Sequence, residues 1–412
     1  MNLPLQSVKT DHVSNAKDQV PRRISIFGST GSVGENTLDL ISFAQSNGAA
    51  NMEVVALTAN RNARLLAEQA IRYGADFAVV ADDKKYDELK AHLQGTEIAC
   101  GAGDAAMLEA AEMEADWVMA AIVGAAGLQP TLTAARRGAD IAFANKECLV
   151  CAGSVFTGAM KQGGGRLLPV DSEHNAIFQV YDFDRPERIT RILLTASGGP
   201  FRTWTRAQMA AVSVEQAVAH PNWSMGAKIS IDSATMMNKG LELIEAARLF
   251  PTPSSDIEII VHPQSVIHSM VEYVDGSVLA QMGTPDMRTP IASALAWPDR
   301  VASPSPKLDF SNLANLTFEE ADAEKFPALR LSREALELDG LAPTALNAAN
   351  EIAVEAFLKR HLKFLDITAV TEQVLTSFGF AKCDGEITLE DVLETDKEAR
   401  RKASDIVATL SA

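Results

Sequence analysis

The sequence predicts an α/β protein in three parts: a doubly wound, Rossmann-like N-terminal domain, a mixed α/β catalytic domain and a C-terminal α-helical bundle. Three observations support this prediction. Short apolar strands alternate with helical stretches over the first 150 residues, a glycine-rich turn follows the first strand, and helical periodicity dominates from about residue 316. Strands separated by helices of roughly 10–15 residues are typical of βαβ units with a parallel sheet.

The N-terminal elements define a nucleotide-binding domain over residues 21–150. An apolar strand enters a glycine turn, and a helix with apolar positions at Leu38, Ile41 and Phe43 follows it. A further helix is expected near 62–73. The predicted strands are 23–28, 52–58, 77–80, 117–122 and 140–144. Residues 1–20 are polar, without an apolar signal core, and are expected to form a loose tail.

The second half of the chain divides into a catalytic domain, a linker and a helical domain. Residues 286–315 are rich in Pro and Ser and predict a linker or crossing segment. From 316 to 412, apolar positions such as Leu346, Ile352, Val354 and Phe357 indicate a helical domain. The catalytic domain, 151–285, includes a flexible lid at about 197–227 and predicted strands at 166–170, 189–195, 257–261 and 277–282.

Composition restricts the classes of partner. The chain has 412 residues, 47% of them hydrophobic, and a formal net charge of −17. This charge argues against nucleic-acid and membrane-surface binding, but not against an anionic ligand, since only nearby cations matter. The longest apolar run, 117–128, is too short to span a bilayer. The four cysteines are scattered, and Cys148-x-x-Cys151 is expected to supply buried structural thiols. A cytoplasmic protein is therefore expected.

The glycine turn predicts a dinucleotide site. Gly28-x-x-Gly31-x-x-Gly34 lies between a strand and a helix, where it allows a pyrophosphate to approach the backbone and the helix N-terminus. The loop after the second strand offers Arg61 and no acid, which favours NADPH over NADH because an arginine can meet the 2′-phosphate. A tight turn without a ligand and a solvated Arg61 are the alternatives.

Two carboxylates close the strand near residue 170. In an extended chain Asp171 and Glu173 would point the same way, and the charges repel unless a cation or proton lies between them. Glu242 could complete a three-carboxylate site, and oxygen ligands suit Mg²⁺ or Mn²⁺ rather than zinc. Two solvated acids are the alternative. His174 could be a ligand or a structural histidine bonded to backbone.

Residues 228–242 predict a strand over 228–232 and a helix from about Ser233. On that helix Asn238, Lys239 and Glu242 would share one face, an arrangement that suits a metal ion beside an anionic ligand. The helix N-terminus itself favours a phosphate. An ordinary surface Lys–Glu pair is the alternative. Lys146 follows a strand of the first domain and could hydrogen-bond a carbonyl or hydroxyl near the metal, unless it forms only a surface pair.

The segment 194–228 has the character of a lid. Ser197 precedes two glycines and offers hydroxyl and backbone donors for a phosphate. Trp223 and Met225 stand on a loop flanked by Pro and Gly, where large apolar side chains need a surface to cover. Closure over reactive chemistry and burial against the helical domain both account for them.

Taken together, these motifs resemble the 1-deoxy-D-xylulose 5-phosphate reductoisomerase family of the non-mevalonate isoprenoid pathway. The resemblance extends in order, almost without gaps, from residue 24 to about 360. It rests on segments 28–34, 120–127, 145–147, 169–178, 194–201, 220–242, 262–268, 283–290 and 344–351. One departure is Asn60-Arg61-Asn62, where a Gly-Lys-Asn is common in the family. The charge is kept there.

The resemblance implies functional residues. NADPH contacts are implied at Thr30, Gly31, Ser32, Val33, Asn145, Glu147 and Gly226, with Arg61 and Asn62 at the adenosine phosphate. One divalent ion per subunit is implied on Asp171, Glu173 and Glu242. Substrate contacts are implied from Lys146, Ser172, Glu173, Ser197, His220, Ser233, Asn238, Lys239 and Glu242.

The resemblance further implies a homodimer that converts 1-deoxy-D-xylulose 5-phosphate to 2-C-methyl-D-erythritol 4-phosphate. In the implied reaction the metal chelates adjacent ketone and hydroxyl oxygens, Lys146 assists, and NADPH reduces a transient aldehyde. A retro-aldol/aldol sequence and an α-ketol shift both remain open. The rival interpretations are a metal-using NADP-dependent dehydrogenase without isomerisation and a catalytically silent NADPH-binding regulator. The three carboxylates and Lys146 together disfavour both rivals.

Overall fold

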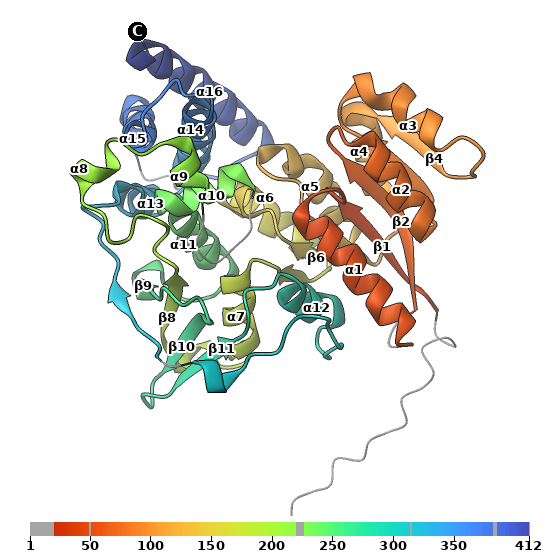
Figure 1. Ribbon diagram of the computed structural model, residues 1–412, viewed down its shortest axis with the longest axis horizontal. Helices are drawn as coiled ribbons and strands as arrows, with labels where there is room; N and C mark the ends of the chain where they lie inside the picture. Colours follow the sequence, from red (N-terminus) through yellow and green to blue (C-terminus); the bar gives the residue numbers. More distant parts are fainter. Residues whose placement is uncertain (1–19, 49–50, 220–225, 314, 382–384, 412) are drawn as a thin grey trace, which may run out of the picture.

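Two sheets and a group of C-terminal helices make up the part of the chain that the computed structural model describes (Figure 1). The described residues are 20–48, 51–219, 226–313, 315–381 and 385–411. The predicted tail lies almost wholly outside them. None of the helices in these ranges is both long and apolar enough to cross a membrane.

Within the described residues, seven parallel strands form the N-terminal sheet in the order β4-β3-β2-β1-β5-β6-β7. The strands are β1 (Arg22–Phe27), β2 (Met52–Ala59), β3 (Phe77–Val80), β4 (Ala99–Ala102), β5 (Trp117–Ala120), β6 (Asp140–Phe143) and β7 (Leu167–Pro169). The intervening helices are α1 (Ser32–Ser46), α2 (Ala63–Tyr73), α3 (Tyr86–His92), α4 (Gly103–Glu112), α5 (Leu128–Arg137) and α6 (Lys146–Gly163). The Rossmann-like prediction is confirmed, although β4 was not predicted. The chain order reverses between β1 and β5, and ligands of such sheets bind at this switch point.

The N-terminal sheet extends beyond the boundary that was predicted at residue 150. That residue falls inside α6, and β7 then pairs with β6 in parallel register, so the strand predicted at 166–170 belongs to the first sheet and not to the catalytic domain. A βαβ crossover through α6 explains the placement, because the helix returns the chain to the same sheet edge. Cys148 and Cys151 are buried free thiols in α6, as predicted.

The second sheet is mixed and has the order β11-β10-β8-β9-β12. Its strands are β8 (Ile189–Ala196), β9 (Ile257–Val261), β10 (Ile267–Tyr273), β11 (Val278–Met282) and β12 (Glu319–Glu320), of which β10 and β12 were not predicted. Helices α7 (Ser172–Val180) and α11 (Met237–Leu249) pack against it. Ile192, Leu194 and Val271 of the sheet are fully buried together with Leu243 and Ile244 of α11. This packing holds α7 and α11, which carry the predicted metal ligands.

The predicted linker is not an unstructured connection. It contains α12 (Arg288–Ala296), which returns to the N-terminal domain and packs against α1. The indole Nε1 of Trp117 donates to the carbonyl oxygen of Ala294 at 3.2 Å, and Arg22 donates to the carbonyl oxygen of Leu295. The Pro- and Ser-rich composition hid this helix, whose middle, from Ile291 to Leu295, is mostly buried.

The C-terminal helices α13 (Pro327–Leu338), α14 (Ala342–Leu358), α15 (Asp366–Phe378) and α16 (Leu389–Ser411) confirm the predicted helical region. Leu346, Val354 and Phe357 of α14 are buried. The helices lie beside α9 (Val214–Val218) and α10 (Ala227–Ala234), so the helical region reaches the catalytic domain (Figure 1). Short helix α8 (Arg206–Met209) precedes α9 in the lid segment.

Candidate active site

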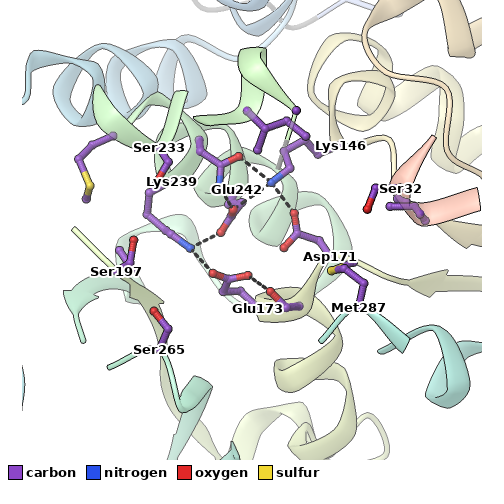
Figure 2. A pocket seen from close by; sticks show the side chains of 18 of the residues that line it. Ser32, Lys146, Asp171, Glu173, Ser197, Ser233, Lys239, Glu242, Ser265 and Met287 are labelled. Carbon is purple, nitrogen blue, oxygen red and sulfur yellow. Dashed lines mark hydrogen bonds and ion pairs between the residues drawn. The ribbon is translucent and has the colours of Figure 1, made fainter. Parts of the chain in front are cut away.

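A cavity of about 190 Å³ lies where the carboxyl end of the N-terminal sheet meets α7, α10 and α11. Its lining includes most of the predicted substrate and metal residues. Ser32 lies on one side of the carboxylates, and Ser197, Ser233 and Ser265 lie on the other (Figure 2). The lining residues are Ser32, Val33, Ala144, Lys146, Asp171, Ser172, Glu173, Ala196, Ser197, Gly198, Gly226, Ile229, Ser233, Met236, Asn238, Lys239, Glu242, Ser265 and Met287.

The three predicted metal ligands come together in this cavity. Oxygen atoms of Asp171, Glu173 and Glu242 lie within 4.8 Å of one another. The extended-chain argument for the first two was wrong, because Asp171 is the N-cap of α7 and Glu173 is in its first turn. The start of α7, and not an extended strand, therefore brings Asp171 and Glu173 together. Glu242 joins them from α11.

Two lysine ammonium groups separate the carboxylates. Lys146 Nζ lies 2.9 Å from an oxygen of Glu242 and also contacts Asp171. Lys239 Nζ lies 2.9 Å from Glu173 and contacts the second oxygen of Glu242 (Figure 2). The Glu242 side chain is 1% exposed, and an unpaired carboxylate so buried would be strongly destabilising. With all five groups charged, the cluster still carries one excess negative charge.

Burial and neighbouring charges push the pKa values of Asp171 and Glu173 apart. Burial, together with the charge of Glu242, raises the pKa of Glu173 to about 7. Burial also opposes ionisation of Asp171, but the Lys146 ammonium and His174 together outweigh it and hold the pKa of Asp171 well below its usual range. A cation near the three groups would favour the ionised form of Glu173 in the same way.

The donor set fits a hard divalent ion. All three acidic side chains offer oxygen, which suits Mg²⁺ or Mn²⁺. They also face a cavity large enough for a ligand to complete the coordination shell. The excess negative charge beside Asp171 and Glu242 favours a cation there.

His174 has a structural environment. Its Nε2 lies 2.9 Å from the backbone carbonyl oxygen of Glu242, and its Nδ1 lies 3.2 Å from the carboxylate of Glu245. Both side chains are completely buried, and Glu245 was not identified from the sequence. The bond to a carbonyl oxygen requires a proton on Nε2, which supports the backbone-bonding interpretation of His174.

Ser197, Ser233, Asn238 and Lys239, the residues predicted to hold the phosphate, all line the cavity. The local structure differs from the prediction, because the strand expected over 228–232 is the helix α10. Ser233 therefore lies in the last turn of a helix and not at its start. Lys228 and Asp232 pair at i,i+4 on this helix, and α10 packs among α9, α11 and α14 instead of joining a sheet.

Met236 separates the two helices that form the floor of the cavity. It adopts a left-handed backbone conformation with φ 63°, and α11 begins at Met237. This break redirects the chain so that Asn238 and Glu242 project from α11 beside Ser233 of α10. Asn238 donates a hydrogen bond to Glu242 and accepts one from Lys146 at 3.0 Å, so the predicted shared face exists.

The glycine turn adopts the geometry of a close backbone approach. Gly28 has φ 89°, and a Cβ there would lie 2.7 Å from the carbonyl oxygen of Ala121. A Cβ at Gly34 would collide with the backbone of Ser29. Ser32 and Val33, at the start of α1, reach the cavity from this turn, as the cofactor prediction requires.

Other predicted cofactor residues lie outside the cavity lining. Arg61 is 74% exposed and pairs with Asp82 at 3.0 Å, and Asn62 caps α2. Asn145 caps α6, and Glu147 pairs with Lys228 at 2.8 Å. Thr30 and Gly31 belong to the turn before α1 but are likewise absent from the lining.

The structure describes the lid segment except for residues 220–225. His220, Trp223 and Met225 lie outside the described residues, so their predicted contacts stay predictions. Gly226, the first described residue after them, lines the cavity. Ser197, at the other end, accepts a hydrogen bond from the backbone N–H of Gly199 at 3.2 Å.

Some lining residues were not identified from the sequence. Ser265 has φ 50° and follows the turn after β9, and Met287 precedes α12. Both lie in segments that the family resemblance includes, 262–268 and 283–290, but no charge or spacing distinguishes them there. Their place in the cavity depends on contacts between segments distant in sequence.

Comparison with known proteins agrees with this geometry. Three family models match this chain. The 1-deoxy-D-xylulose 5-phosphate reductoisomerase model matches residues 24–153, and the model of the C-terminal domain of that enzyme matches residues 167–250. A further model, the DXP reductoisomerase C-terminal domain, matches residues 282–402. The reductoisomerase of Rhodospirillum centenum is 59% identical over 94% of this chain and 94% of its own length. The reductoisomerase of Caulobacter vibrioides is 55% identical over 94% of this chain and 97% of its own length.

Solved structures give the same result. The reductoisomerase from Zymomonas mobilis in complex with NADPH is 52% identical, with a TM-score of 0.87 over 94% of this chain and 99% of that one. A reductoisomerase in complex with NADPH, fosmidomycin and magnesium is 42% identical, with a TM-score of 0.90 over the same shares. The chain therefore belongs to the 1-deoxy-D-xylulose 5-phosphate reductoisomerase family.

Proposed function

We propose that this chain converts 1-deoxy-D-xylulose 5-phosphate to 2-C-methyl-D-erythritol 4-phosphate with NADPH and one Mg²⁺ or Mn²⁺ per subunit. The observation that carries the proposal is the position of the carboxylates Asp171, Glu173 and Glu242 between Ser32 and Ser233. A substrate bound in this cavity would direct its phosphate toward Ser233, and the dinucleotide would lie on the opposite side, near Ser32. The homodimer and the cytoplasmic location remain predictions.

The carboxylates Asp171, Glu173 and Glu242 would hold the ion. When bound, the ion supplies Lewis acidity toward adjacent ketone and hydroxyl oxygens, and NADPH supplies the hydride. Lys146 donates to Glu242 and contacts Asp171, so its ammonium also lies where charge develops on substrate oxygen.

The phosphate side fixes the substrate far from the reacting carbons. Ser197, Ser233, Asn238 and Lys239 offer hydroxyl, amide and ammonium donors from three separate elements. Ser172 lies beside the carboxylates, and His220 is predicted to join from the lid. Holding the phosphate in this way orients the carbon skeleton and lowers the entropic part of the barrier.

The dinucleotide would lie along the glycine turn and the start of α1. Ser32 and Val33 face the cavity, and Thr30 and Gly31 complete the turn. Asn145, Glu147 and Gly226 are proposed at the nicotinamide side, and Arg61 and Asn62 at the adenosine phosphate. The pair between Arg61 and Asp82 must open or rearrange to accept a 2′-phosphate.

NADPH consumption tests the proposal. We expect loss of NADPH absorbance when the purified chain receives 1-deoxy-D-xylulose 5-phosphate and Mg²⁺ or Mn²⁺, and recovery of 2-C-methyl-D-erythritol 4-phosphate. Consumption without that product would indicate a simple dehydrogenase. No consumption with either ion would contradict the enzymatic proposal, and NADPH binding alone would then favour a regulator.

A further inference from the structure

A second cluster of buried charge lies beside the cavity and is centred on Lys228. This residue is near the start of α10, two positions after Gly226 and five before Ser233, both of which line the cavity. Lys228 itself does not line it. Its Nζ lies 2.8 Å from Glu147 and 2.8 Å from Asp232.

The partners of Lys228 depend on its charge. The side chains of Glu147 and Asp232 are 6% and 2% exposed, whereas Lys228 is 21% exposed. A carboxylate buried to this degree is strongly destabilising without a cationic partner. The position of Lys228 is therefore fixed by two separate buried groups, one on α6 and one on its own helix.

The cluster continues into the C-terminal helical region. Asn350 of α14 is completely buried and donates a hydrogen bond to the second oxygen of Asp232 at 2.8 Å. The next residue, Glu351, adds negative charge near Lys228 and pairs with Arg400 of α16. The Lys228 ammonium thus connects α6 and α10, and Asp232 connects α10 to α14.

The two helices that Lys228 connects, α6 and α10, contribute residues to opposite sides of the active site. Glu147 directly follows Lys146, whose ammonium reaches Glu242 in the cavity. On the other side, α10 carries Ser233 of the phosphate side and begins after Gly226 of the lid. A shift of α10 relative to the start of α6 would change the spacing between the cofactor and the sugar phosphate.

We propose that Lys228 is a positioning residue, which sets the spacing between the cofactor side and the phosphate side of the active site by holding Glu147 and α10 together. The inference rests on the proposed function, because it takes Glu147 and Ser233 as groups beside NADPH and the phosphate. Lys228 acts through them and touches neither ligand.

Two variants of Lys228 test this role. Lys228→Met keeps much of the length of the side chain and removes its charge, whereas Lys228→Arg keeps the charge. NADPH affinity is measured by calorimetry on the whole protein, and KM for NADPH and for the sugar phosphate is measured with Mg²⁺. Lys161→Met is the matched control, because Lys161 is an exposed lysine on the same helix as Glu147.

We expect Lys228→Met to weaken NADPH binding by about tenfold or more and to raise both KM values, because small misplacements at an active site have large effects. Lys228→Arg should recover most of the loss, and Lys161→Met should match the wild type. A double variant with Glu147→Gln should lose little beyond the single Lys228→Met. If Lys228→Met does not fold, Lys228→Gln provides the same comparison.

A lower melting temperature with unchanged NADPH affinity and unchanged KM values would overturn the inference, since it would show a purely structural role. An Arg variant as impaired as the Met variant would also overturn it. If the wild type consumes NADPH and the Lys228 variants match it, this inference alone fails. If the wild type has no turnover, the proposed function fails, and the calorimetric comparison still decides whether Lys228 controls NADPH binding.

Discussion

Two clusters of buried charge lie beside α10, and they differ in whether their carboxylates line the cavity. Around Lys228, the buried carboxylates of Glu147 and Asp232 are paired with the ammonium group, and Asn350 satisfies a further oxygen. In the cavity, three carboxylates share Lys146 and Lys239. Each cluster has one more carboxylate than ammonium groups, but only the carboxylates of the second cluster line the cavity, where a ligand can reach them.

The comparison teaches where a charged side chain is placed for chemistry. A buried ion pair alone is weak evidence for stability or for function. What distinguishes Asp171, Glu173 and Glu242 is an excess of oxygen donors at a cavity. Burial raises the pKa of Glu173 to about 7, and the neighbouring charge of Glu242 adds to this rise.

The largest effect should follow from removing a carboxylate of the cavity cluster. Glu242→Gln removes one of the proposed metal ligands and leaves two buried ammonium groups with fewer partners, so kcat/KM should fall by about 10²- to 10⁴-fold. Steady-state rates with Mg²⁺ measure the loss. Glu355→Gln, on the exposed surface of α14, is the control and should retain full activity. Equal turnover in the two variants would sink the metal assignment.

Metal removal should abolish turnover but leave the fold intact. Lys146 and Lys239 already pair with the three carboxylates, so the protein without the ion keeps most of its charge balance. After treatment with a chelator we expect full loss of activity, recovery with Mg²⁺ or Mn²⁺, and a far-ultraviolet circular dichroism spectrum like that of the untreated protein. Unfolding on chelation would show that the ion is structural.

A smaller effect is expected from a residue that is proposed to bind the phosphate. Ser233→Ala removes one donor to a charged group, which is worth about 1.5–3 kcal/mol and corresponds to roughly a 10- to 100-fold rise in KM for the sugar phosphate. The KM for NADPH should change little. Ser154→Ala, an exposed serine on α6, is the control. A rise confined to the KM for NADPH would place Ser233 on the wrong side of the cavity.

The smallest effect should come from an ion pair outside both clusters. Arg401 pairs with Glu398 and Asp405 along the exposed face of α16. Such pairs contribute little, because solvent and salt screen them. Arg401→Ala should leave the melting temperature and all kinetic constants unchanged within error. A clear loss of stability would mean that this exposed pair stabilises the fold as much as a buried one does.

Much of this arrangement could be predicted from local sequence signals. Buried parallel strands and the glycine turn at Gly28–Gly34 gave the first sheet, and the carboxylates and Lys146 stood out by residue type. The alternation of Ile229 and Ile231 led to the wrong prediction of a strand over 228–232. Five residues with a period of 2 also fit a short helix, and the i,i+4 pair of Lys228 and Asp232 supports the helix.

The contacts that could not be predicted are those between residues far apart in the sequence. Glu147 and Lys228 are 81 positions apart, and Asp232 and Asn350 are 118 positions apart, so neither contact has a local pattern. The helix start at Asp171 was hidden for a similar reason, since packing of α7 on the second sheet decides it. Propensity is a weak prior wherever tertiary packing outweighs it.

Binding of Mn²⁺ to the wild type and to Asp171→Asn tests the central claim most directly. Electron paramagnetic resonance titration reports free and bound ion without any need for turnover. We expect one Mn²⁺ bound per chain in the wild type and a large loss of affinity in the variant, because Asp171 would be a ligand. Wild-type stoichiometry and affinity in Asp171→Asn would contradict the account.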